Sequence, residues 1–432
     1  MKVKMLLAIF LLLAVSPVSA FADAPAKVDT GDTAFVLISA ALVMLMTPGL
    51  ALFYGGMVRG KNVLGTLMQS FVAIAVISVQ WILFGYSLSF GPDMHGIIGS
   101  LDWAGLCGVG AEPNPDYAPT VPHLAFMIYQ AMFAVITPAL ITGAVAERMK
   151  FSAFLLFMVL WSTIVYDPIA HWVWGTGGWL KNMGALDFAG GVVVHISSGI
   201  SALAAAIVVG RRKGFPHDAI YPHNLPMTVL GAGLLWFGWF GFNAGSALSS
   251  GVLSTWAFVA THTSAVCATL IWVVIEWLHR GKPTMFGAAT GSIAGLATVT
   301  PAAGFISPLS AMIVGLAAGS ICYIALNMKT KFGYDDSLDA FGVHGVGGIV
   351  GTLATGLFAQ TLINPAGSNG LFYGNPNLFV TQLIAVGVSA LYSFVITVIL
   401  LKVIDMIIGL RIEDDDEIKG LDISQHGERG YS

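Results

Sequence analysis

The sequence predicts an all-α protein that crosses a membrane eleven times. Three observations support this fold class: the composition, the length of the apolar segments and the distribution of basic residues. Of the 432 residues, 56% are hydrophobic and 10% are charged, whereas a soluble domain carries about 25% charged residues. A soluble core could not hide so much apolar surface, so lipid must surround much of the chain. The net charge of −4 gives no reason to expect a nucleic-acid partner.

The N-terminus predicts a secretory signal peptide over residues 1–22. Lys2 and Lys4 form a basic start, residues 5–15 form an apolar core, and Ala20-Phe21-Ala22 offers a cleavage site. The alternative is an uncleaved first helix, although the apolar run is short for a span. After cleavage, residues 23–408 would form the membrane domain and residues 409–432 a cytoplasmic tail.

Eleven apolar segments follow the signal peptide. Each is near the roughly 20 residues that a spanning helix needs, the shorter ones less securely. Their approximate limits are 33–56, 64–90, 122–145, 151–173, 188–210, 226–243, 254–278, 285–300, 304–328, 340–359 and 378–408. The 51 glycines would allow these helices to approach one another closely.

The basic residues predict an orientation with the N-terminus outside and the C-terminus inside. In that orientation fifteen of the 19 lysines and arginines fall on the cytoplasmic side. Lys27 and Lys181 fall outside, while Lys2 and Lys4 leave with the signal peptide. This asymmetry follows the positive-inside rule, and an even number of spans would scramble it.

The extramembrane segments and the cysteines are less informative. Residues 91–121 and 360–377 are predicted to be outer loops, and the acidic run 413–417 is either a solvated tail or a functional element. The odd number of cysteines excludes a fully paired disulfide framework. We interpret Cys107, Cys267 and Cys322 as small buried hydrophobic residues.

Two histidines stand at matching places in the chain. His195 lies in the fifth predicted span and His344 in the tenth, each after an Asp-containing, glycine-rich lead-in (Asp187 and Asp339). If spans 1–5 and 6–10 are two halves, the odd number five makes them inverted repeats around a central pore, with sites near the midplane where they meet. Ionisable groups inside a membrane are costly and usually functional. The alternative is two unrelated core histidines bonded to the backbone.

Two neutral imidazoles edge to edge can share one N–H and offer a small amine both a donor and an acceptor. A bare cation would meet a heavy desolvation cost in such a pore. Asp187 lies eight residues before His195, about 12 Å along a helix, so it cannot touch the same guest. We expect it to be an N-cap, and the alternative is an electrostatic role near the pore mouth.

Aromatic residues gather at the outer ends of several spans. Trp174 ends the fourth span, Phe242 and Ser246 end the sixth, and Tyr129 and Phe133 lie near the outer end of the third. An interfacial aromatic belt would explain them. A cage would explain them too, because ring faces attract a cation by roughly 0.5–2 kcal/mol each.

Other candidates carry less weight. The sequence has no His-Glu-x-x-His, Gly-x-Ser-x-Gly or P-loop motif, so we expect no enzyme activity, metal or cofactor. His171 and His262 have no partner at an equivalent place and are interpreted as packed histidines. Glu276 is expected to pair with Arg280 four residues on.

At these residues the sequence resembles the ammonium transporter (Amt/Mep/Rh) family, of the bacterial Amt type, over essentially the whole mature chain. The segments that carry the resemblance are Asp187 to Arg212, Phe53-Tyr54-Gly55-Gly56 with Gly60-Lys61-Asn62-Val63-Leu64, Pro168-Ile169-Ala170-His171, Pro222-His223-Asn224-Leu225-Pro226 and Phe341-Gly342-Val343-His344-Gly345.

The resemblance implies eleven helices around one pore per subunit, in a homotrimer of the cell inner membrane that serves nitrogen metabolism. Phe133, Trp174 and Ser246 fall at the family's outer ammonium-recruitment site, and Phe133 and Phe242 at its phenylalanine gate. His195 and His344 fall at its pore histidine pair, and Asp187 at its aspartate near the recruitment site. Tyr129, where some relatives carry Phe, differs only by a hydroxyl.

The resemblance also implies a regulatory tail and a PII-type nitrogen-regulatory partner at the cytoplasmic face. The expected activity is conduction: ammonium docks, loses its proton, and ammonia passes the histidine pair. The rival interpretations are a sensor that binds ammonium without moving it and a gas channel of the Rh type. Trp174 argues against the gas channel, because a neutral gas needs no cation–π site.

Overall fold

The computed structural model describes residues 28–218 and 220–431. The predicted signal peptide, residues 1–22, lies outside the described residues. Within them, ten helices are long and apolar enough to cross a membrane, and an eleventh apolar helix is shorter. Each of the eleven predicted segments corresponds to one of these helices, and the all-α membrane fold class is confirmed.

Several of the spans are continuous rods built from more than one helical piece. In chain order the pieces are α2 (Thr30–Met57), η1 (Gly60–Asn62) with α3 (Val63–Gln80), η2 (Trp81–Gly85) and α4 (Tyr86–Phe90), α5 (His123–Val145), α6 (Phe151–Trp161) with η4 (Ser162–Tyr166) and α7 (Asp167–Val173), η5 (Gly191–Ile196) with α9 (Ser197–Val209), α10 (Leu225–Ala244) with η6 (Gly245–Ala247), α11 (Val252–Arg280), α12 (Met285–Val299), α13 (Pro308–Phe332), η7 (Phe341–Gly345) with α14 (Val346–Phe358), and α15 (Pro376–Ile408).

The outward faces of these helices are apolar. Large side chains such as Leu270 on α11, Ile324 on α13 and Leu391 on α15 are 64%, 56% and 67% exposed. So much exposed apolar surface would be an aggregation site in water. These faces suit contact with lipid or with another apolar surface inside a membrane, which agrees with the composition.

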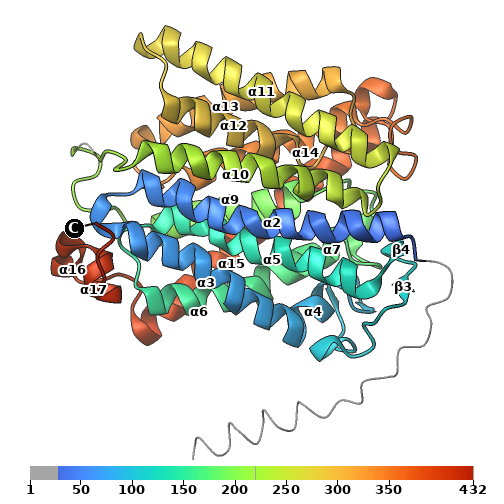
Figure 1. Cartoon of the computed structure of the whole chain (residues 1–432), viewed down its shortest axis with the longest axis horizontal. Helices are drawn as coiled ribbons and strands as arrows, with labels where there is room; N and C mark the ends of the chain where they lie inside the picture. Colours follow the sequence, from blue (N-terminus) through green and yellow to red (C-terminus); the bar gives the residue numbers. More distant parts are fainter. Residues whose placement is uncertain (1–27, 219, 432) are drawn as a thin grey trace, which may run out of the picture.

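The helices form two halves that pack against each other with opposite direction. α2, the first span, lies along α10, the sixth, and the two run in opposite directions (Figure 1). At the centre, α9 of the first half crosses η7 of the second. A Cβ added to Gly199 would lie 2.0 Å from the backbone nitrogen of Gly345, so this crossing requires glycine.

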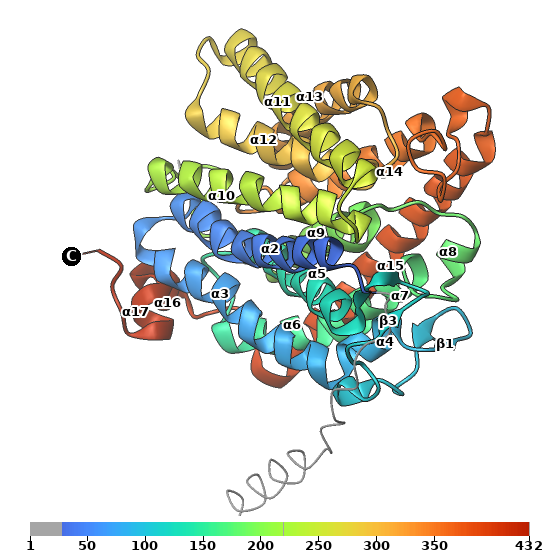
Figure 2. The same cartoon turned by 45° about the vertical axis from the view of Figure 1, so that its right-hand side comes forward.

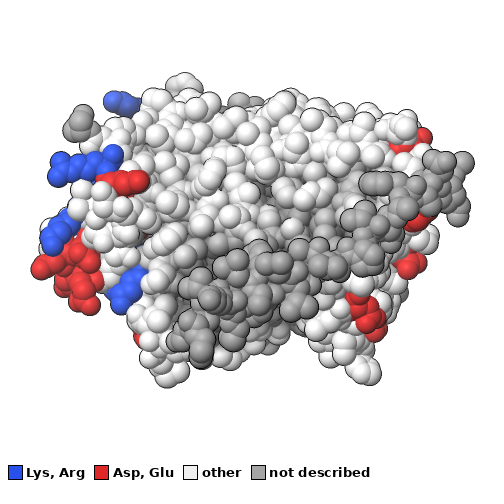
Figure 3. Space-filling model, turned by 60° about the horizontal axis from the view of Figure 1, so that its bottom comes forward, with Lys and Arg blue, Asp and Glu red and all other residues white. Residues whose placement is uncertain are grey.

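The two ends of the bundle differ in charge. On the face drawn in Figure 3, the lysines and arginines gather at one end, together with the acidic residues of the C-terminal tail, and the opposite end shows only acidic side chains. The opposite end carries the segment 91–121, which contains two hairpins where only a loop was predicted. Their strands are β1 (Asp93–Met94) with β2 (Ile98–Gly99) and β3 (Pro113–Asn114) with β4 (Ala118–Pro122).

Short helices complete this end. They are η3 (Ala104–Leu106), α8 (Trp179–Asn182) and η8 (Leu371–Tyr373). α8 and β1 lie at the end opposite to the C-terminus (Figure 2), where the N–H of Trp179 in α8 donates to the carbonyl of Gly96 between β1 and β2 at 3.1 Å. Cys107 is exposed here and Cys267 is half-buried, so the prediction of three buried cysteines is wrong for these two and holds for Cys322. Cys107 is exposed because it belongs to an extramembrane loop.

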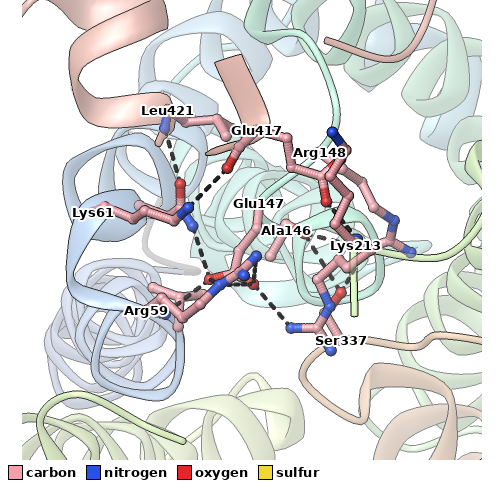
Figure 4. Close-up of polar contacts among 12 residues, drawn as sticks. Arg59, Lys61, Ala146, Glu147, Arg148, Lys213, Ser337, Glu417 and Leu421 are labelled. Atoms are coloured by element: carbon pink, nitrogen blue, oxygen red, sulfur yellow. Dashed lines mark hydrogen bonds and ion pairs between the residues drawn. The ribbon is translucent and has the colours of Figure 1, made fainter. Parts of the chain in front are cut away.

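The tail packs onto the basic end as α16 (Asp414–Lys419) and α17 (Leu421–His426). Glu417 is 1% exposed, so the solvated-tail interpretation of the acidic run is wrong at this residue. Its carboxylate accepts from Arg411 at 2.6 Å and from the backbone N–H of Lys213 at 2.7 Å. Lys61 donates to the Glu417 carbonyl at 2.9 Å (Figure 4). The tail is therefore fixed to η1 and to the loop after α9 at the basic end.

Candidate functional site

A cavity of about 180 Å³ opens at the end of the bundle opposite to the basic end. Four of the predicted site residues line it: Phe133 from α5, Trp174 just after α7, Ser246 from η6, and Asp187 before η5. Phe242 lies directly beneath. The predicted outer residues are thus brought together, although they come from four separate spans.

The rings of this cavity have fixed orientations. The centroids of Phe133 and Trp174 are 6.0 Å apart, with ring planes at 87°. The indole N–H of Trp174 donates to the carbonyl of Asp187 at 2.8 Å, which holds the ring in the wall. A cation in the cavity therefore meets preoriented aromatic surfaces.

Polar oxygens complete the cavity. Ser246 donates its hydroxyl proton to the carbonyl of Phe242 at 2.9 Å, so its oxygen can still accept a hydrogen bond from a guest. The Tyr129 hydroxyl lies 2.9 Å from the carbonyl oxygens of Gly241 and Phe242 and 3.1 Å from Ser246 Oγ. The sequence analysis interpreted this hydroxyl as a minor difference, whereas in the structure it contacts the end of α10 and Ser246 of η6.

Two phenyl rings close the floor. The centroids of Phe133 and Phe242 are 4.3 Å apart with an angle of 41° between planes, and each residue is 1% exposed. A hydrated ion cannot pass between rings so close. A guest that continues inward must lose its water, at a high cost for a charge.

Below the rings lies a narrow apolar cavity of about 10 Å³. Its lining includes Phe53, Val194 and Ile293 together with His195 and His344. At that volume it holds one water-sized molecule at most. The predicted histidines therefore share one small, otherwise apolar space.

The two histidines face each other. Their Nδ1 atoms are 3.2 Å apart, so one N–H lies between them and one ring accepts it. His195 Nε2 is buried and has no hydrogen-bond partner among the described residues. The His195 ring also stacks on Trp239 at 5.6 Å and on Phe242 at 6.0 Å. Sequence reasoning missed the contact with Trp239, because the two residues are on different helices.

Asp187 was predicted to be an N-cap, but the N-cap residue of η5 is Gly190, and Asp187 caps the helix start from three residues earlier. Its carboxylate accepts the backbone N–H groups of Gly190, Gly191, Val192 and Val193 at 2.6–3.1 Å. Burial raises the pKa of Asp187, and these four N–H groups oppose the shift. The residue does not touch His195, and it forms part of the wall of the cavity of about 180 Å³.

In the second half, Asp336 caps the start of η7 in the same way. Asp336 lies eight residues before His344, as Asp187 lies eight before His195, and it accepts the N–H groups of Ala340 and Phe341 at 3.1 and 2.8 Å. The sequence analysis paired Asp187 with Asp339 as the lead-ins to the two histidines, and this pairing is wrong. The equal spacing to the histidine was the signal that identifies the true counterpart. Burial and the neighbouring Asp339 raise the pKa of Asp336 to about 6.

Sequence reasoning also missed a buried carboxylate at the basic end. Glu147 adopts a left-handed backbone (φ 71°) and is 1% exposed. It accepts from the backbone N–H of Arg59 at 2.8 Å (Figure 4). It also accepts from Asn62 Nδ2 at 2.8 Å and from Arg212 at 3.0 Å. Burial alone would raise the pKa of Glu147, but Arg212 and Arg59 outweigh it and hold the pKa below its usual value.

The remaining predicted candidates have structural surroundings. His171 is buried, with Nε2 at 2.9 Å from Asp93 Oδ1. His262 is exposed on α11 beside Trp236, so its interpretation as a packed histidine is wrong: it faces outward from the bundle. Glu276 lies 3.9 Å from Arg280, but the N–H of Thr284 is nearer, at 3.0 Å.

No group of three or more His, Cys, Asp or Glu side chains within residues 28–218 and 220–431 is arranged to hold a metal ion.

Comparisons with known proteins give one consistent result. The model of the Ammonium Transporter Family matches residues 34–431. An ammonium transporter of Bacillus subtilis is 53% identical over 402 residues, which cover 93% of this chain and 98% of that protein. The ammonium transporter Amt1 of Archaeoglobus fulgidus is 50% identical over 402 residues, covering 93% and 99%.

Solved structures agree. The crystal structure of Saccharomyces cerevisiae Mep2 has a TM-score of 0.86 at 35% identity and covers 90% of this chain and 89% of its own. A structure described as a Sensor Amt Protein has a TM-score of 0.85 at 30% identity, covering 92% and 98%.

Proposed function

The chain belongs to the ammonium transporter family, and from that membership we propose how it moves its substrate. Ammonium binds at Phe133, Trp174 and Ser246, loses its proton at or below the Phe133–Phe242 gate, and ammonia passes His195 and His344. The proton either stays behind or crosses separately. The coarser statement, a multi-span membrane protein of ammonium transport, follows from the family itself.

One observation carries the mechanism: the histidine pair, with its Nδ1 atoms 3.2 Å apart, lines an apolar cavity of about 10 Å³ under a closed pair of phenyl rings. Such a space suits a small neutral amine, which the free nitrogen and the N–H can bind. It disfavours a cation, because little in it replaces the water of hydration.

Deprotonation would supply the selectivity. Ammonium and potassium ions are similar in size, so an aromatic cage alone discriminates poorly. Only ammonium can release a proton, and removing water from an amine of Lys type, which titrates near about 10.4, lowers its pKa. Potassium has no neutral form and stops at the gate.

Location and regulation complete the proposal. We place the protein in the cell inner membrane as a homotrimer, with residues 1–22 as signal peptide, 23–408 as membrane domain and 409–432 as a cytoplasmic regulatory tail. The docked α16 and α17 support a regulatory role for the tail, because a change in their contacts reaches two cytoplasmic loops. A PII-type nitrogen-regulatory protein is the partner we propose for this face.

A sensor is the second candidate, and a specific observation favours it: the similarity to a structure described as a Sensor Amt Protein. A pure sensor would bind ammonium in the outer cavity and move nothing. Purified protein in liposomes separates the two functions.

The deciding experiment is an ammonium-driven current on a solid-supported membrane that carries the reconstituted protein. Potassium serves as the ion control, and His195→Ala and His344→Ala are compared with His262→Ala, whose side chain faces outward. We expect a current selective for ammonium that survives in His262→Ala and is lost, or becomes potassium-permeable, in the other two.

Three other results would change the proposal. Retained ammonium selectivity in His195→Ala would overturn the role of the histidines. Ammonia uptake seen by internal pH without current would keep the channel and remove charge movement. Neither signal, with ammonium binding retained, would favour the sensor.

A further inference from the structure

The wall of the outer cavity contains a cation of its own. Lys181, on α8, lines the same space of about 180 Å³ as Phe133, Trp174 and Ser246. Its ammonium group donates to the carbonyl of Trp174 at 2.9 Å and lies 5.7 Å from the centroid of the Tyr117 ring. None of the ion pairs in the described part of the chain involves Lys181, although Asp116 also lines the cavity.

These contacts are the ones a free ammonium ion would make. Carbonyl oxygens accept N–H groups, and aromatic faces attract positive charge. A lysine head group is an ammonium ion with one hydrogen replaced by an alkyl chain. The cavity therefore already holds a tethered relative of the proposed substrate at its rim.

We propose that Lys181 is a built-in competitor that sets the affinity of the outer site for ammonium. The inference rests on the proposed function, because it assigns this cavity to ammonium. Lys181 acts in two ways: it engages the Trp174 carbonyl and the Tyr117 face, and it places a positive charge in the cavity. Asp116 has the opposite charge in the same cavity and partly offsets it.

The competition keeps the site weak for ammonium. Two like charges in one small cavity repel, and the repulsion is screened only partly at low salt. Lys181 is thus an affinity-determining residue and not part of the deprotonation step. Its removal should strengthen binding, whereas removal of a residue that merely supports the wall should weaken it.

The test measures the ammonium concentration that gives half-maximal current in reconstituted protein. The variants are Lys181→Gln, which is neutral and can still donate to Trp174, Lys181→Met, which keeps the apolar stem, and Lys181→Arg, which keeps the charge. Lys282→Gln, an exposed lysine at the other end of the bundle, is the matched control. Each is measured at low and high salt.

We expect both neutral variants to lower the half-saturating concentration by about three- to tenfold at low salt, with a smaller effect at high salt. Lys181→Arg and Lys282→Gln stay near wild type, and Asp116→Asn raises the concentration. An unchanged or raised value in Lys181→Gln and Lys181→Met would overturn the inference.

The two proposals fail in distinguishable ways. If the wild type carries no ammonium, the proposed transport fails, and calorimetric dissociation constants of ammonium for the same variants still decide the role of Lys181. If the wild type transports ammonium and the lysine variants show no affinity gain, only the inference about Lys181 fails. The absence of any ammonium binding by the purified protein would overturn both.

Discussion

Trp174 offers the most direct test of the outer cavity at the scale of one residue. Replacing it with Leu removes a ring face that stands at 87° to Phe133. A cation–π contact is worth roughly 0.5–2 kcal/mol, so we expect the half-saturating ammonium concentration to rise roughly two- to thirtyfold. Trp179→Leu is the control, because Trp179 packs on Trp172 instead. Equal effects in both variants would contradict a binding role for Trp174.

Tyr129 shows what a single oxygen can contribute. Its hydroxyl lies 2.9 Å from two carbonyl oxygens of α10 and 3.1 Å from Ser246 Oγ. We expect Tyr129→Phe to lower the free energy of unfolding by about 1–2 kcal/mol, because the carbonyls of Gly241 and Phe242 lose one buried donor, and to weaken ammonium binding through Ser246. Thermal unfolding and the half-saturating concentration check the two effects. Tyr373→Phe, at an exposed hydroxyl, should change neither.

The types of the site residues could be read from the sequence, but their contacts could not. Histidines inside apolar spans and aromatic residues at span ends are costly or specific enough to be noticed one at a time. The stacking of Trp239 on His195 at 5.6 Å and the bond from Trp174 to Asp187 depend on how separate helices pack. No local pattern encodes such a distance.

At the scale of elements, the two aspartates define how the pore helices begin. η5 and η7 are both π-helical turns that contain a pore histidine, and each is capped by an aspartate eight residues before that histidine. Such turns often mark functional sites. The sequence predicted a span at each place, yet it could not predict the wider turn, because the same residues also suit an ordinary α-helix.

The caps give a paired prediction. Asp187→Ala and Asp336→Ala each leave buried N–H groups without an acceptor, so we expect each to lower the free energy of unfolding by about 1–3 kcal/mol. Thermal unfolding in detergent measures this loss, and Asp102→Ala, at an exposed loop residue, is the control. If either variant unfolded like Asp102→Ala, the capping account would be wrong for that half.

The caps should also affect conduction through the histidines they position. Asp187→Asn keeps an acceptor oxygen and should restore part of the stability lost in Asp187→Ala. Recovered stability together with lost ammonium current would point to a role for the charge beyond capping.

At the scale of the whole molecule, hydropathy and charge predicted the spans because both signals are local. Each of the eleven predicted segments has its helix, and on the face drawn in Figure 3 the lysines and arginines gather at one end. The docking of the tail was not predictable in the same way. Leu421 donates its N–H to Asn62 at 2.8 Å across 359 residues of sequence, and no periodicity reports a contact at that separation.

Glu147 is the central contact among the loops at the basic end. Its carboxylate contacts Arg59, Asn62 and Arg212, and Arg212 in turn pairs with Asp335 at 2.8 Å. Asn62 is also the acceptor for the tail at Leu421. One buried carboxylate therefore connects three loops and, through Asn62, the tail.

Glu147→Gln should loosen this assembly. Removing one partner of a buried ion pair costs about 3–5 kcal/mol, so we expect a marked fall in thermal stability and faster trypsin cleavage at Lys419 in the tail. Glu428→Gln, an exposed residue of the same tail, is the control.

The stability that Glu147 contributes should depend on pH, since the pKa of Glu147 in the folded protein lies below its usual value. Its contribution to the free energy of unfolding is fully present above pH 4.5 and is lost as the pH falls through the lower pKa of the folded state. The difference in unfolding temperature between wild type and Glu147→Gln should therefore be constant near neutral pH and shrink in acid. A difference that grew in acid, or a tail no more accessible than in Glu428→Gln, would show that Glu147 does not couple the loops to the tail.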